Sequence, residues 1–198
     1  MKKIFSVLLC AVILAVSFSA CSGKTEMTED NVTKSIDKAI TALIKFDSKD
    51  MEKYIESATL STIMNYADSH EQFAELGRAI FANLEYEITN IDIENKTVTL
   101  SVKNKDLYEV AADVASNLKS DYSTFQLAAK LSDDRFLDRK LAAITQSIDA
   151  APMQEEATEI TLEIAQGDKN LYFVFDENAE NAASGGALGA IKDIFLLG

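Results

Sequence analysis

An apolar run opens the chain, and two kinds of periodic pattern follow it. Apolar residues fill almost every position from Ile4 to Phe18. Further on, stretches with apolar residues three and four positions apart predict helices, and stretches in which every second residue is apolar predict strands. The resulting order is helices, a hairpin, more helices and a second hairpin.

Helical spacing covers most of the chain after the apolar run. The predicted helices span, in order, 28–47, 48–55, 59–67, 69–83, 106–131, 132–151 and 188–197. Polar residues that can cap a helix stand at four of the starts: Asp47, Asp106, Asp133 and a capping box, Ser69-x-x-Gln72. Pro152, the only proline, ends the second long helical stretch.

Two hairpins interrupt the helices. The first pairs 84–94 with 97–103 around the turn 94–96, and the second pairs 158–165 with 171–175. In the first, the apolar positions change from even to odd near Thr89-Asn90, which predicts a bulge. The pattern therefore predicts an α+β fold, with an antiparallel sheet of about four strands and helices packed on one face.

The N-terminal run has the composition of an export signal. Lys2 and Lys3 precede it, and the small residues Ser19-Ala20 follow it directly before Cys21. A charged start, an apolar centre and small residues at the end predict a secretory signal peptide. The alternatives are plain secretion and an uncleaved anchor, because Ile4–Ala20 is 17 residues long, at the short limit for a membrane span. All three place the folded part outside the cytoplasm.

The end of this segment, Phe18-Ser19-Ala20-Cys21, resembles the lipobox of bacterial lipoproteins, with Phe18 where Leu is usual. The resemblance implies a diacylglyceryl group on the Cys21 thiol, and cleavage that leaves Cys21 as the first residue. A lipoprotein carries two or three acyl chains, which is enough for stable membrane attachment.

The chain then divides into three parts: a signal peptide over 1–20, the lipidated Cys21 with a tether over 21–27, and a single α+β domain over 28–198. The mature chain carries 17 basic and 32 acidic side chains, a net charge of −15. Such acidity argues against a nucleic acid partner. It also repels an anionic membrane surface, so membrane attachment depends on the acyl chains.

The residues that usually carry chemistry are scarce. Cys10 lies in the signal peptide, so His70 and the lipidated Cys21 are the only histidine and cysteine of the mature chain. They cannot build a zinc site or a Cys–His pair, and no G-x-S-x-G sequence is present. Gly185-Gly186 lacks the lysine of a phosphate loop, and Asp133-Asp134 lacks the glycine of a calcium loop. We therefore predict no catalytic residue, no metal site and no cofactor.

The two faces of the predicted sheet differ in polarity, and each is a candidate functional surface. The sheet face predicted to be buried is apolar except for Tyr86, which leaves few groups for a catalytic cavity. The opposite, solvated face carries four glutamates that keep the sheet soluble or form a docking surface: Glu85, Glu87, Glu159 and Glu163.

The whole arrangement resembles small bacterial lipoproteins of unknown function with a nuclear-transport-factor-2-like, cystatin-like roll. The resemblance rests on the lipobox, the helices around "FDSKD", the hairpin "LEYEITNIDIENKTVTLSVKN" and the strand pair followed by "NAASGGALGAI". The helical stretch 106–151 departs from that pattern, and Leu171-Tyr172-Phe173 stands where a Trp is often found. None of the catalytic His or Asp positions of that superfamily's enzymes has a counterpart here.

The leading hypothesis is a non-catalytic, membrane-anchored lipoprotein outside the cytoplasm that binds a small molecule or a protein partner. One alternative is an enzyme with a cone-shaped pocket between sheet and helices. The other is a structural component of the cell envelope.

Overall fold

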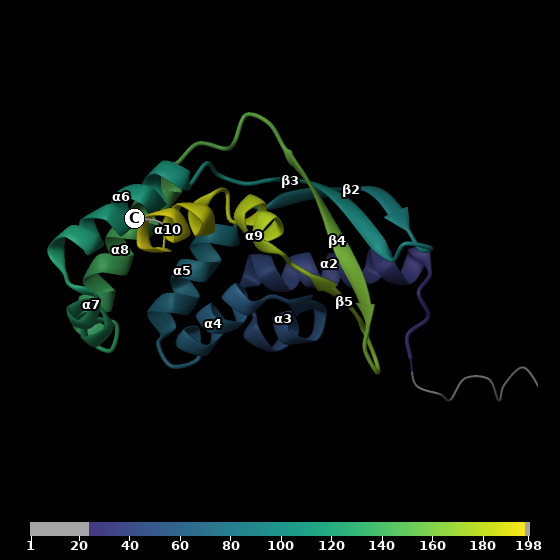
Figure 1. Ribbon diagram of the computed structural model, residues 1–198, viewed down its shortest axis with the longest axis horizontal. Coiled ribbons are helices and arrows are strands. Elements are labelled where there is room, and N and C mark those ends of the chain that lie inside the picture. The colour runs from purple at the N-terminus through teal and green to yellow at the C-terminus, as the bar shows by residue number, and fades with distance from the viewer. Residues whose placement is uncertain (1–23, 197–198) are drawn as a thin grey trace, which may run out of the picture.

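The computed structural model describes residues 24–196, so Cys21 and the predicted signal peptide lie outside the described part. This part is an α+β structure with five strands and nine helices (Figure 1). The strands are β1 (Ile55–Glu56), β2 (Glu85–Asp92), β3 (Thr97–Lys103), β4 (Thr158–Gln166) and β5 (Leu171–Val174). The helices are α2 (Glu29–Lys45), α3 (Ser48–Tyr54), α4 (Ala58–Ala67), α5 (Glu71–Phe81), α6 (Tyr108–Asp121), α7 (Thr124–Lys130), α8 (Asp134–Ala150), α9 (Glu177–Ala183) and α10 (Ala187–Leu196).

The sheet is mixed, with strand order β1-β5-β4-β3-β2. Both predicted hairpins are present, and the bulge in β2 is confirmed by a register shift between Ile88 and Asn90. The prediction of a purely antiparallel sheet of about four strands is wrong, because β1 pairs parallel with β5. Helical spacing had assigned Ile55 to a helix. In the structure Ile55 is instead paired with Phe173 in the sheet, and its side chain is buried. The next residue, Glu56, accepts a hydrogen bond at its carbonyl from the Phe175 amide at 2.9 Å. A two-residue strand is too short to produce a periodic pattern.

The main core lies between one face of the sheet and α2 (Figure 1). Helix α2 starts at the Thr28 hydroxyl, which accepts a hydrogen bond from the Asn31 amide at 3.3 Å. The strand residues that alternate toward this helix are buried: Val98, Leu100, Val102, Ile160, Leu162, Ile164, Leu171 and Phe173. Polar side chains alternate with them on the other face, where Thr99 and Thr161 form a hydrogen bond. Burial of each such apolar side chain contributes about 1.5–3 kcal/mol.

A second group of helices stands beside the sheet. We call α5, α6, α7, α8 and α10 the helical lobe; in Figure 1 its helices α6, α7, α8 and α10 gather at the end of the molecule away from β2. Helix α10 lies along α6, and α5 lies along α8. Leu107, Ile148 and Ala187 form a small buried cluster at the base of this lobe.

The connection between sheet and helical lobe is held by backbone hydrogen bonds. The Leu107 amide donates to the Gly185 carbonyl at 2.8 Å, and the Asp106 amide donates to the Pro152 carbonyl at 2.8 Å. The Lys105 ammonium donates to the carbonyls of Ile148 and Asp149, the last turn of α8. The two bonds from Lys105 satisfy carbonyls that the end of α8 leaves unpaired.

The predicted helix starts are correct at Asp47 and Asp133, whose carboxylates accept from amides of the first turn. The Ser69 capping box is wrong: α5 begins one residue later, behind His70, and no side chain caps it. The Asp106 cap is wrong as well, since Leu107 holds that position in α6. Before α6 the amides of Asp106 and Leu107 donate to the carbonyls of Pro152 and Gly185, contacts that are not local in sequence. Before α5 the amides of Ser69 and His70 donate to the nearby Tyr66 carbonyl.

Candidate functional site

The space between sheet and α2, where the enzyme hypothesis places a pocket, is occupied by apolar side chains. Leu100, Leu162 and Phe173 from the sheet are fully buried, as are Ile36 and Leu43 from α2. The chain thus fills this interface as an ordinary core.

Tyr86, the single polar residue predicted on this face, has a structural partner. Its hydroxyl donates a hydrogen bond to Asp37 Oδ1 on α2 at 2.6 Å. Burial, and then the hydrogen bond to this carboxylate, raise the pKa of Tyr86 to about 12. Tyr86 is therefore held as a neutral phenol that ties β2 to α2.

Glu180 on α9 is the only buried carboxylate in the part of the chain that the structure describes. It accepts a hydrogen bond from the Ser57 hydroxyl, and that oxygen in turn accepts from the Leu60 amide at 2.9 Å. Ser57 is the N-cap of α4, so the pair joins α4 to α9. The Ser57 hydroxyl both donates and accepts a hydrogen bond here. We therefore interpret the Ser57–Glu180 pair as a structural link between the two helices.

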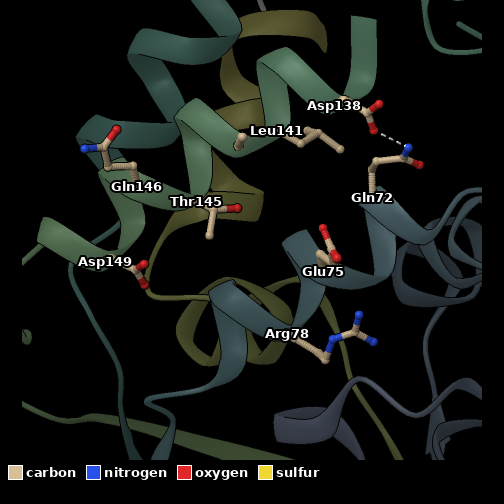
Figure 2. A pocket seen from close by; sticks show the side chains of 9 residues that line it. Gln72, Glu75, Arg78, Asp138, Leu141, Thr145, Gln146 and Asp149 are labelled. Atoms are coloured by element: carbon tan, nitrogen blue, oxygen red, sulfur yellow. Dashed lines mark hydrogen bonds between the residues drawn. The ribbon is translucent and has the colours of Figure 1, made fainter. Parts of the chain in front are cut away.

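A polar cleft of about 580 Å³ runs between α5 and α8 (Figure 2). Figure 2 shows the side chains of Gln72, Glu75 and Arg78 on α5 and of Asp138 and Asp149 on α8, with Gln72 facing Asp138. Gln72 Nε2 donates to Asp138 Oδ1 at 2.5 Å, so this pair closes one end of the cleft.

Charged groups beside this cleft form two further pairs. Arg78 forms an ion pair with Glu71 at 2.5 Å, and His70 Nδ1 lies 3.1 Å from Asp134 Oδ1. The sequence predicts His70 to be an exposed residue next to Ser69; in the structure it lies against Asp134 at the start of α8. Both pairs are solvent-exposed, where ion pairs contribute about 0–1 kcal/mol. We interpret the cleft as a solvated seam between two helices.

Metal ligands do not converge anywhere in residues 24–196: no group of three or more His, Cys, Asp or Glu side chains could hold an ion. Within the same range, no helix has the length and apolar character needed to cross a bilayer.

The strongest candidate site is an apolar cavity of about 240 Å³ in the helical lobe, partly open to solvent. All five helices of the lobe contribute to its wall, from Phe73 on α5 to Phe195 on α10. Lys140 on α8 is the only charged or polar residue among those that line it. Ligand pockets typically have this composition, with a mostly apolar wall and a few polar groups that fix orientation.

Incomplete packing marks this cavity as different from the main core. Val110, Val114 and Leu118 on α6 face α8, yet each of them is only half-buried. Leu127 on α7 and Ile144 on α8 also line the cavity and are also half-buried. These side chains leave apolar surface open to solvent. Exposed apolar hollows of this kind are typical of binding sites.

Sequence reasoning missed this site, although it identified the residues that form it. The spacing of Val110, Val114 and Leu118 predicted an apolar helix face. Periodicity does not reveal whether two such faces pack tightly or leave a space, because helix separation depends on the connections and the neighbouring helices.

Comparison with known proteins gives no further guidance. No protein-family model matches the chain, and searches of curated proteins and of solved structures returned no match. The candidate site is therefore interpreted from its own geometry and chemistry.

Proposed function

We propose that this chain is a membrane-anchored lipoprotein outside the cytoplasm, and that it binds a small apolar ligand in the cavity of the helical lobe. The observation that supports ligand binding is the wall of this cavity, which is apolar except for Lys140. An apolar wall of this kind favours the binding of apolar molecules, because binding removes apolar surface from water.

The size of the cavity limits the ligand. A cavity of about 150 Å³ holds benzene, which has six carbon atoms. By proportion, a cavity of about 240 Å³ holds roughly ten carbon atoms. A partner helix, with a diameter of about 10–12 Å, is too thick to enter. A single acyl or alkyl chain of medium length fits best.

The anchor is proposed from the lipobox resemblance at Cys21, and the first described residues suggest how the domain is oriented. Thr25 Oγ1 donates to the Lys169 carbonyl at 2.6 Å, and Gln166 Nε2 donates to the Thr25 carbonyl at 2.5 Å. Both partners lie at the turn between β4 and β5, away from the helical lobe (Figure 1). A lipid on Cys21 would thus hold the sheet end near the membrane, with the cavity farther out.

Ligand binding is tested by thermal unfolding of the full chain in lipid nanodiscs, with and without decan-1-ol. A ligand at about a hundred times its Kd adds about 2.7 kcal/mol to the free energy of unfolding. For a chain of this length that raises the melting temperature by about 5–10 °C. We expect a rise of this size, measured by far-ultraviolet circular dichroism.

A cavity-filling variant locates the binding. Ala111→Phe puts a ring into the cavity, and Ser116→Phe puts the same ring at an exposed position of the same helix, α6. We expect the decanol effect to disappear in the first variant and persist in the second; Val114→Phe replaces Ala111→Phe if that variant does not fold. No rise in the wild-type chain, or an equal rise in both variants, would contradict the proposal.

A further inference from the structure

We propose that the ligand is a single-chain amphiphile with an anionic head group, which the Lys140 ammonium binds. This inference rests on the proposed apolar ligand site and adds the chemical class of the ligand. Its first support is a second hollow, a shallow cleft of about 180 Å³ between α6 and α8, which shares four lining residues with the cavity. Val114, Leu118, Lys140 and Ile144 line both spaces.

The two spaces differ in chemistry. Asn117 on α6 and Ser147 on α8 line the cleft and are exposed, whereas neither lines the cavity. Lys140 is the only charged residue that lines either space. A molecule whose tail occupies the cavity and whose other end reaches Lys140 must have an apolar tail and a polar head.

Lys140 is available to bind such a head. In residues 24–196 its ammonium forms no ion pair and no hydrogen bond with another side chain or with the backbone. Two other lysines of the helical lobe are engaged: Lys130 lies 4.0 Å from Asp133, and Lys119 donates to the Ile194 carbonyl at 2.7 Å. Because Lys140 is half-buried, a carboxylate beside it is screened less by water than at an exposed lysine.

One further group of the cleft suits an anionic head. The Ser147 hydroxyl already donates to the Ala143 carbonyl at 3.2 Å, but the Asn117 amide provides N–H donors. Charge-assisted hydrogen bonds of a carboxylate with these donors and the Lys140 ammonium would fix the head, while the tail occupies the cavity. A cationic head would meet Lys140 with a like charge.

The test compares ligands of equal tail length on the full chain in nanodiscs, with thermal unfolding as the measurement. We expect decanoate to bind about tenfold more tightly than decan-1-ol, as one charge-assisted hydrogen bond predicts. Decyltrimethylammonium should bind more weakly than decan-1-ol. Empty nanodiscs and a short acid, acetate, serve as blanks.

Lys140→Met removes the charge and keeps most of the apolar stem. This variant should lose the preference for decanoate and keep the binding of decan-1-ol. Arg139→Met, one residue earlier on α8 and exposed, is the matched control and should keep both.

The outcomes separate this inference from the proposed function. Binding of decan-1-ol without a preference for decanoate would overturn the anionic head and leave the apolar site standing. A preference that survives Lys140→Met would overturn the role of Lys140. If neither ligand raises the melting temperature, both proposals fail.

Discussion

Asn104 joins four segments of the backbone at the junction between sheet and helical lobe. Its Nδ2 donates to the Ile80 carbonyl at 2.9 Å and to the Ala183 carbonyl at 2.7 Å, the ends of α5 and α9. Its backbone exchanges two hydrogen bonds with Gln154, in the loop after α8. The side chain is completely buried, so no water replaces these partners. One residue thus sets how the two parts of the chain meet.

Replacement of Asn104 by Ala should lower the free energy of unfolding by about 2–6 kcal/mol. Two buried carbonyls lose their donor, and each unsatisfied polar group costs about 1–3 kcal/mol. Denaturant unfolding measures this loss. Asn65→Ala, at an exposed position on α4, is the control and should change stability by less than about 0.5 kcal/mol. An equal, small change in both variants would show that Asn104 does not hold the junction.

At the scale of elements, α10 depends on the turn that precedes it. Gly185 and Gly186 have φ angles of 61° and 89°, which place α10 against α6. A Cβ on Gly185 would lie 1.9 Å from the Lys105 carbonyl oxygen. Only glycine, which has no Cβ, fits this close approach. The Gly185-Gly186 turn also determines the position of α10, whose Ile191 and Phe195 line the cavity.

Gly185→Ala should therefore displace α10. We expect a loss of at least about 1–2 kcal/mol from the left-handed backbone alone, and more from the clash with Lys105. Hydrogen exchange should show faster exchange of α10 amides, with β3 and β4 less affected. Gly167→Ala, in the turn between β4 and β5 and without a positive φ, is the comparison. Unchanged protection of α10 in Gly185→Ala would refute this role of the turn.

At the scale of the whole molecule, the start of the described chain and the proposed cavity lie at opposite ends. Thr25 contacts the turn between β4 and β5, and the helical lobe lies at the other end of the molecule (Figure 1). The net charge of −13 keeps the chain soluble and repels anionic surfaces, so attachment would depend on the acyl chains. This arrangement would leave the cavity accessible from the aqueous side.

Cys21→Ser should abolish acylation and release the protein from the membrane fraction. The reason is chemical: a thioether needs the thiol, and two or more acyl chains are what makes attachment stable. Metabolic labelling with a radioactive fatty acid, followed by fractionation, measures both effects. Cys10→Ser, in the predicted signal peptide, is the matched control and should leave labelling intact. Labelling that persists in Cys21→Ser would contradict the lipoprotein proposal.

Sequence reasoning predicted most of the elements and little of their assembly. The alternation of Val98, Leu100 and Val102 against threonine and serine predicted a strand with one buried face, and this is confirmed. Helix α9 was missed because its short stretch of Ala, Asn and Glu has weak periodicity. The anchor at Cys21 stays a prediction, since that residue lies outside the described part.

What the sequence determined by itself is local: the α+β class, the buried face of the sheet, the β2 bulge and the caps at Asp47 and Asp133. Each follows from side-chain spacing or from a hydrogen bond within a few residues. Tertiary structure alone decided that β1 pairs parallel with β5 and that α6, α8 and α10 enclose a hollow. Those features depend on contacts between residues far apart in the chain, such as Leu107 with Gly185, and local patterns carry no information about such contacts.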